Sequence, residues 1–198
     1  MTEFKKKNTV FPGSVVIYRD GVGDSQKKAV LLYELPQLQA AIKKVFNIDA
    51  NSTDELPIKL LVCLVNKRVS QRFFDCQNPN RLTNPLPGTI VDSDVVASDS
   101  YDFFLVSQIS RQGVVSPTHY VIVYDSTGRD SSEIQQLTYK LCYTYYNVAG
   151  SIKVPAPIQY AHRLANLIGD RAKGGSNVNS IPIPHQHFGN AIKSLYFI

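Results

Sequence analysis

The segment Ser14-Val-Val-Ile-Tyr-Arg-Asp20-Gly-Val-Gly-Asp24 decides the fold of this chain. Its β-branched and aromatic residues favour an extended strand, and Gly21 and Gly23 allow the chain to turn away sharply after it. An acidic residue at the carboxyl end of a buried strand lies where open α/β sheets present ligands and metal ions. Asp20 is therefore a candidate site residue, although an ordinary turn aspartate before glycine explains it as well.

The composition is typical of one soluble globular domain. The chain has 198 residues, of which 43% are hydrophobic and 19% charged, so it can bury a sizeable core. The net charge of +5 favours a polyanionic partner without requiring one. Cys63 and Cys142 lie in apolar runs, and none of the three cysteines has CxxC spacing, so we expect reduced core thiols in an intracellular protein. No apolar run approaches the ~20 residues of a membrane span, and the basic start lacks the apolar stretch of a signal peptide.

Strands and helices alternate along the chain, which predicts a mixed α/β fold. Residues 1–12 form a polar lead-in to the first strand. The predicted strands are Ser14–Arg19, Ile58–Val65, Thr89–Asp92, Phe103–Ser107 and His119–Tyr124. The predicted helices are Ser25–Phe46 with a kink or break at Pro36, a segment that opens at the capping box Asp130–Glu133, and a segment from Pro157 to Gly169. We expect residues 170–190 to form a flexible loop.

Five stretches resemble, in order, the Piwi domain of the Argonaute/Piwi family. Tyr18-Arg-Asp-Gly-Val-Gly-Asp24 is similar to the strand that carries the second catalytic aspartate of that family. The other stretches are Leu64-Val-Asn-Lys-Arg68 with Arg72-Phe-Phe; Pro87-Gly-Thr-Ile-Val-Asp92; Asp102-Phe-Phe-Leu-Val-Ser107 with Gln112-Gly113 and Pro117-Thr-His-Tyr120; and Leu137-Thr-Tyr-Lys-Leu-Cys142 with Pro155-Ala-Pro157 and Tyr160-Ala-His162. The resemblance is greater to the Piwi branch, and it implies an RNase H-like fold. Residues 13–198 would then be the C-terminal half of a Piwi domain, a partial sheet with flanking helices.

The resemblance assigns metal chemistry to Asp20 and His162. RNase H-type cleavage uses two divalent metal ions, Mg²⁺ or Mn²⁺, held by carboxylates and sometimes by a histidine. Asp20 would bridge the metals and His162 would complete the catalytic set, although a histidine with a structural hydrogen bond is the alternative. By contrast, Asp92, Asp94, Asp99 and Asp102 are explained by loop solvation and turn capping.

Two acidic residues of the family site lack a counterpart in this sequence. Only 19 residues precede Asp20, and they contain no aspartate that could serve as the first catalytic aspartate and no suitable finger glutamate. We therefore expect a half-site that is inactive in the isolated chain. The chain would be a fragment or a truncated product, with Ser14–Arg19 as an exposed edge of the sheet.

A second group of residues would hold a guide RNA. Lys67, Arg68 and Arg72 follow a buried strand, so their cations emerge together where they can meet phosphates; a solvated basic turn is the alternative. By resemblance, they line the channel for the seed of the guide together with Gln108, Gln112, Tyr145 and Lys153. The carboxylate of Ile198 would bind a metal ion at the 5′ phosphate of the guide, and an apolar tail packed on the core is compatible with that role.

Two functions are compatible with these assignments. The first is that of a germline protein for piRNA-type, RNA-guided silencing, an endonuclease that cuts target RNA with Mg²⁺ when the Piwi domain is complete. Its partners would be guide and target RNA, a Mid domain and the N-terminal half of the Piwi domain. The second is that of a truncated, catalytically inactive Piwi-like module that binds RNA or a protein. Either would act in the cytoplasm, in germ granules or in the nucleus, away from membranes.

Overall fold

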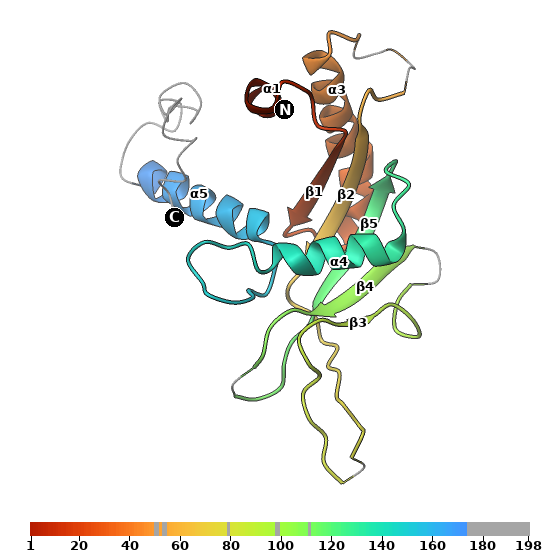
Figure 1. The fold of residues 1–198 in the computed structure, drawn as a ribbon, viewed down its shortest axis with the longest axis vertical. Coiled ribbons are helices and arrows are strands. Elements are labelled where there is room, and N and C mark those ends of the chain that lie inside the picture. The colour runs from red at the N-terminus through yellow and green to blue at the C-terminus, as the bar shows by residue number, and fades with distance from the viewer. Residues whose placement is uncertain (50–51, 53–54, 79, 98–99, 111, 174–198) are drawn as a thin grey trace.

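In this computed structural model, a five-stranded mixed sheet forms the centre of the protein (Figure 1). The structure describes residues 1–173 except 50–51, 53–54, 79, 98–99 and 111. The strands are β1 (Ser14–Asp20), β2 (Lys59–Asn66), β3 (Thr89–Val91), β4 (Tyr101–Val106) and β5 (Thr118–Asp125). They lie in the order β1-β2-β5-β4-β3, in which β1 and β2 are parallel and the other neighbours antiparallel. The predicted α/β class is confirmed, and so is the prediction that the first strand forms an edge of the sheet.

The strand β2 lies in the core because almost all of its side chains are apolar. Residues 60–65 are fully buried, since helices cover both faces of the sheet at this strand. On one face, Cys63 packs with Ile134 of α4 (Ser131–Leu141) and Ile158 of α5 (Ala156–Lys173). On the other face, Leu60 packs with Leu35 and Ile42 of α3 (Leu35–Val45). The predicted burial of the cysteines at 63 and 142 is confirmed.

The segment after β1 is helical but is not one regular α-helix. The 3₁₀ turn η1 (Asp24–Gln26) and α2 (Lys27–Ala29) lead into a π-helical segment, η2 (Val30–Glu34), which continues into α3. In η2 the amide of Leu35 donates to the carbonyl of Val30, one residue further back than in an α-helix. Pro36 follows in the first turn of α3, where a missing N–H group is tolerated. The predicted break near Pro36 is therefore confirmed, in the form of a π-helical segment.

The described chain is helical at both of its ends. The polar lead-in contains α1 (Thr2–Asn8), and Phe11 after it packs on Phe46 at a ring-centroid distance of 4.3 Å. The helix α5 continues through Gly169 to Lys173, so the predicted helix end at Gly169 is wrong, and so is the predicted loop at residues 170–173. A single glycine within a helix costs only about 1 kcal/mol, which the packing of an apolar stripe can offset. Residues 174–190 of the predicted loop lie outside the described residues. No helix within the described ranges combines the length and apolar character needed to cross a membrane.

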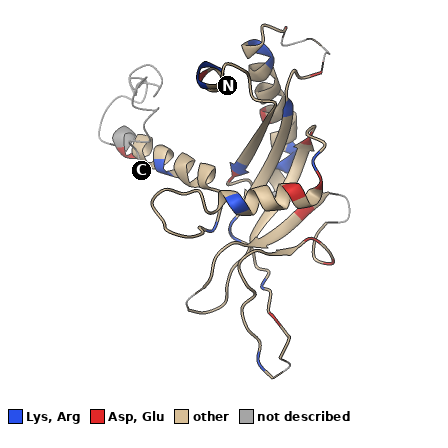
Figure 2. Ribbon diagram, in the orientation of Figure 1, with Lys and Arg blue, Asp and Glu red and all other residues tan. Residues whose placement is uncertain are grey.

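The parallel pairing of β1 with β2 brings their carboxyl ends together. In this register Asp20 lies beside Val65, so the residues that follow both strands emerge at one end of the sheet. The end of β1 carries a basic and an acidic residue next to each other (Figure 2). The first turns of α5 lie beside the same end of β1 (Figure 1). Residues from three elements therefore meet there.

Candidate metal and nucleic-acid site

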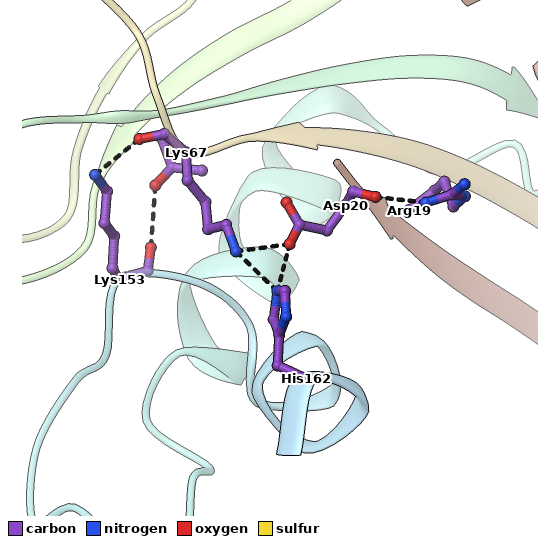
Figure 3. A network of polar contacts seen from close by, with 6 residues as sticks. Arg19, Asp20, Lys67, Lys153 and His162 are labelled. Carbon is purple, nitrogen blue, oxygen red and sulfur yellow. Dashed lines mark hydrogen bonds and ion pairs between the residues drawn. The ribbon is translucent and has the colours of Figure 1, made fainter. Parts of the chain in front are cut away.

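The side chains of Asp20 and His162 meet at the carboxyl end of β1 (Figure 3). Asp20 is the last residue of this strand, and Gly21, at a φ of 77°, turns the chain away from it. His162 lies in the second turn of α5, and its Nε2 is 2.5 Å from Asp20 Oδ2. The Asp20 side chain is 14% exposed and that of His162 is 42% exposed, so both remain accessible to a ligand. The fold thus brings together the two residues to which the resemblance assigned metal chemistry.

The ammonium group of Lys67 completes this cluster. Lys67 directly follows β2, and its Nζ lies 2.7 Å from Asp20 Oδ2 and 2.8 Å from His162 Nε2. Burial raises the pKa of Asp20, but the hydrogen bonds and charges of Lys67 and His162 together outweigh this effect. The pKa of Asp20 therefore lies below its usual range, and the residue is a carboxylate at neutral pH.

A cavity of about 400 Å³ lies beside these side chains. Its volume is in the range of small-ligand pockets. Gly21 and Gly23 line it with backbone alone, so that a ligand can approach the main chain closely. The residues around the cavity are Asp20, Gly21, Val22, Gly23, Val65, Asn66, Lys67, Arg68 and His162. A carboxylate, an imidazole and two cations therefore share one open pocket.

The donor atoms fit a divalent metal ion in kind. A carboxylate oxygen and an imidazole nitrogen that converge are ligands that Mg²⁺ or Mn²⁺ can use, and Mg²⁺ commonly retains several waters beside one or two carboxylates. Within the part of the chain that the structure describes, no group of three or more His, Cys, Asp or Glu side chains could hold a metal ion. Among the described residues, two side chains of ligand type therefore converge, which is fewer than a two-metal site requires.

Three of the predicted guide-binding cations influence one another electrostatically. Lys153 Nζ donates to the carbonyl of Lys67 at 2.9 Å and to the hydroxyl of Ser116 at 3.3 Å. Burial lowers the pKa of Lys153, and the positive charges of Arg72 and Lys67 lower it further. The exposed side chain of Arg68 lines the same cavity as Asp20. Cations from the end of β2 and from the segment before α5 therefore surround one region, as an anionic backbone would require.

The other residues predicted to contact the guide differ from one another in exposure. Gln108 and Gln112 are exposed, and both lie in the loop between β4 and β5. Tyr145 is buried against Tyr160 at a ring-centroid distance of 5.2 Å, and its hydroxyl has no partner among the described residues. Packing therefore occupies its ring, and its hydroxyl oxygen is buried as well. Ile198 lies outside the described residues.

The sequence analysis missed an ion pair that holds the end of β1. The guanidinium of Arg19 contacts both carboxylate oxygens of Glu34, at 2.8 and 3.1 Å, and it also donates to the carbonyl of Asp20 at 2.5 Å. The pair ties the candidate ligand Asp20 to η2, which holds Glu34. An arginine before Asp20 and an acid in the next helix were visible in the sequence, but nothing local indicated that they meet.

For Asp102, the sequence analysis expected loop solvation and turn capping, and only the capping is confirmed: its Oδ1 accepts from the amide of Ala97 and the hydroxyl of Ser100. Asp102 is instead a buried residue of β4, and its Oδ2 lies 2.5 Å from Nε2 of His119 on β5. The expected solvation was wrong, because the residue is buried and pairs with a neighbouring strand rather than with water.

Solved structures of other proteins share this architecture. The crystal structure of Drosophila Piwi matches 85% of this chain with a TM-score of 0.73 and 38% identity, and the match covers 22% of that chain. The structure of Kluyveromyces polysporus Argonaute with a guide RNA matches 88% of this chain with a TM-score of 0.77 and 26% identity, again over 22% of that chain. The sheet and helices described above therefore form the RNase H-like fold of these proteins.

The sequence matches place the chain within a family. The family model described as Piwi domain matches residues 1–173. Piwi-like protein 1 of Danio rerio is 44% identical over 176 residues, which is 89% of this chain and 20% of that protein. Piwi-like protein 1 of Gallus gallus is 48% identical over 169 residues, which is 85% of this chain and 19% of that protein. The chain therefore belongs to the Piwi domain family, and it spans about a fifth of the length of these relatives.

Proposed function

We propose that this chain acts in small-RNA-guided silencing, where it binds the guide and contributes ligands to a metal-dependent site for RNA cleavage. The observation that supports this most directly is the convergence of Asp20 and His162 on a cavity with basic residues around it, in a Piwi-domain fold. Because Piwi-like proteins are among the relatives, we propose a guide of the piRNA type.

Each residue would have a distinct role in this function. Bound divalent metal ions would activate the attacking water and stabilise the leaving oxygen. Asp20 would hold them through its carboxylate and His162 through Nε2. The basic and polar residues would contact the phosphates of the guide, whose bases remain free to select the target by pairing. These residues are Lys67, Arg68, Arg72, Gln108, Gln112, Tyr145 and Lys153, and we propose the carboxylate of Ile198 for the 5′ phosphate.

We further propose that the described residues supply only part of the catalytic site. Two protein ligands converge among them, whereas a two-metal site of the RNase H type is a cluster of carboxylates. Further acidic residues of a Piwi domain would complete it. The 198-residue chain alone would then bind RNA without cutting it.

A second candidate function, binding without cleavage, has an observation in its favour. The ammonium of Lys67 already pairs with Asp20 and contacts His162, so both candidate ligands are engaged within the described chain. A module of this kind would hold a small RNA or a protein partner in the same cavity and cut nothing.

The two functions are separated by a cleavage assay with guide and target RNA in Mg²⁺. The chain is assayed alone and joined to the N-terminal half of a Piwi domain from a relative. We expect cleavage only by the joined protein, with a loss on the order of 1000-fold in Asp20→Ala and in His162→Ala. Asp170→Ala, an exposed acid further along α5, is the matched control and should cut normally.

Cleavage by the chain alone would contradict the proposal that its residues supply only part of the catalytic site. Normal guide binding by the joined protein without any cleavage would favour the second function. Full activity in Asp20→Ala would exclude this residue as a metal ligand.

A further inference from the structure

Three polar atoms converge closely between β1, β2 and α5 (Figure 3). Asp20 Oδ2, His162 Nε2 and Lys67 Nζ form a triangle with sides of 2.5, 2.7 and 2.8 Å. A neutral imidazole nitrogen either donates or accepts a hydrogen bond. If Nε2 accepts from Lys67, its lone pair faces the carboxylate oxygen; if it donates to Asp20, its N–H faces the ammonium. In either tautomer, one of the two contacts that Nε2 makes is therefore unfavourable when considered alone.

In the tautomer whose Nε2 is unprotonated, a cation shared by two acceptors accounts for this geometry. Two lone pairs that point at one place repel each other unless positive charge lies between or beside them, and this is how ligands of a metal ion are arranged. The ammonium of Lys67 supplies that charge, since it is in contact with both acceptors. Lys67 therefore takes the place of a metal ion toward this pair of residues.

The backbone of Lys67 is held by a hydrogen bond, whereas its side chain is partly exposed. The Lys67 carbonyl accepts a hydrogen bond from Lys153, which holds the main chain after β2. Its side chain is 33% exposed and has a flexible four-carbon stem. A lysine ammonium is a compact point charge without a fixed fork of donors, so it can exchange a carboxylate for a phosphate. Arg72 and Lys153 lie close enough to make the same region attractive to a phosphate.

We propose that the Lys67 ammonium is an internal cation that competes with the metal ion for Asp20 and His162, and that it leaves them when it binds a guide phosphate. The second half of the proposal rests on the proposed guide-binding function. Guide binding and metal binding would then strengthen each other. A guide phosphate would draw the Lys67 ammonium away from Asp20 and His162, and a metal ion bound there would free the ammonium for the phosphate. A chain without a guide would be kept from binding metal by its own side chain.

The first test is a titration of the 198-residue chain with Mn²⁺, followed by electron paramagnetic resonance of the free ion. We expect Lys67→Met to bind Mn²⁺ about 10-fold more tightly than the unmodified chain. Lys59→Met removes the same charge at the opposite end of β2, and Arg68→Met removes a charge from the cavity itself. Both controls should change the affinity far less. Adding Asp20→Ala to Lys67→Met should abolish the gain.

The outcome decides the proposal without any activity measurement. Equal gains in Lys67→Met and Arg68→Met would show a general charge effect and overturn it. Unchanged, weaker or undetectable Mn²⁺ binding in Lys67→Met would overturn it too. Circular dichroism verifies the fold, and Lys67→Gln provides a second uncharged variant should Lys67→Met fail to fold.

The second test adds a short, 5′-phosphorylated single-stranded RNA, with Mn²⁺ binding to the RNA alone subtracted. We expect the RNA to raise the Mn²⁺ affinity of the unmodified chain about fivefold and to leave that of Lys67→Met unchanged. If the RNA binds both chains and changes neither affinity, the coupling is wrong while the proposed guide binding stands. If the RNA binds neither chain, the proposed function fails, and the first test still decides whether Lys67 competes with metal.

Discussion

Two acid–imidazole pairs in this protein have the same length and contrasting surroundings. The Oδ2–Nε2 distance is 2.5 Å both in Asp20–His162 and in Asp102–His119. In the second pair the aspartate side chain is 3% exposed and the histidine 16%, and the imidazole stacks on Phe104 at 4.3 Å between ring centroids. In the first pair both side chains are more exposed and border a cavity.

The remaining carboxylate oxygen accounts for much of the difference. In Asp102 it accepts hydrogen bonds from the amide of Ala97 and the hydroxyl of Ser100, so the carboxylate is satisfied within the protein. In Asp20 both the ammonium of Lys67 and the imidazole contact the same oxygen. The distance alone therefore does not distinguish a structural pair from a binding site. A binding site is distinguished by open space next to the pair and by carboxylate lone pairs that the described residues do not use.

The two pairs should differ most in how much stability the protein loses when the aspartate of each pair is replaced by alanine. Asp102→Ala leaves a half-buried imidazole and two further donors without their acceptor, and should lower the free energy of unfolding by about 4 kcal/mol. Asp20→Ala removes a partly exposed acid and should lower it by less than about 1 kcal/mol. Urea denaturation followed by circular dichroism measures both. Equal losses would mean that the two pairs are energetically alike.

Replacing the histidines should also destabilise the buried pair more than the open one, but the two losses in the free energy of unfolding should differ less. His119→Ala removes the stack on Phe104 and the partner of a buried carboxylate, and should cost about 2 kcal/mol. His162→Ala removes a side chain that is 42% exposed, so we expect less than about 1 kcal/mol. The same denaturation experiment applies. A larger loss in His162→Ala would indicate that the Asp20 pair stabilises the fold.

The Asp20 pair should also respond to pH in a defined direction. Since the folded-state pKa of Asp20 is lowered, its carboxylate stabilises the fold above the unfolded pKa, near 4, and this contribution is lost as pH falls through the folded pKa. Exposure to solvent limits the contribution to about 1 kcal/mol. Unfolding of the unmodified chain and of Asp20→Asn should therefore differ near neutral pH, and the difference should shrink in acid. A difference that grows in acid would mean that the pKa is raised.

The smallest effect should come from the ion pair that ties the open site to η2. A double-mutant cycle of Arg19→Met and Glu34→Gln should give a coupling of about 0.5 kcal/mol, which salt should reduce. The pair Lys6–Glu3 on α1 is more exposed and makes one contact instead of two, so its cycle is the control and should give less. A coupling no larger than the control would show that Arg19 contributes little to the position of Asp20.

The resemblance to the Piwi domain predicted that Asp20 and His162 share a site, and nothing predicted the pair of Asp102 and His119; local patterns only placed residues on their elements. Asp20 follows a β-branched run, and His162 lies on a helix that begins near a proline, so each could be placed on its element. The burial of Asp102 depends on the register that sets Phe104 opposite His119, and register is a long-range property. Lys67 was correctly predicted to follow a buried strand. Its contact with Asp20 could not be predicted because it requires three elements to meet.

The π-helical segment has a consequence for the length of the chain. Val30 and Leu35 are five residues apart and both buried, because the wider turn brings them to the same side of the helix. Leu31, Leu32 and Tyr33, which lie between them, are exposed. In-frame loss of the Leu32 codon would place the two buried residues four apart, the natural spacing of one α-helical face. Glu34 would stay next to Leu35, on the side from which it now reaches Arg19, so we expect a chain shortened by this one residue to keep the site.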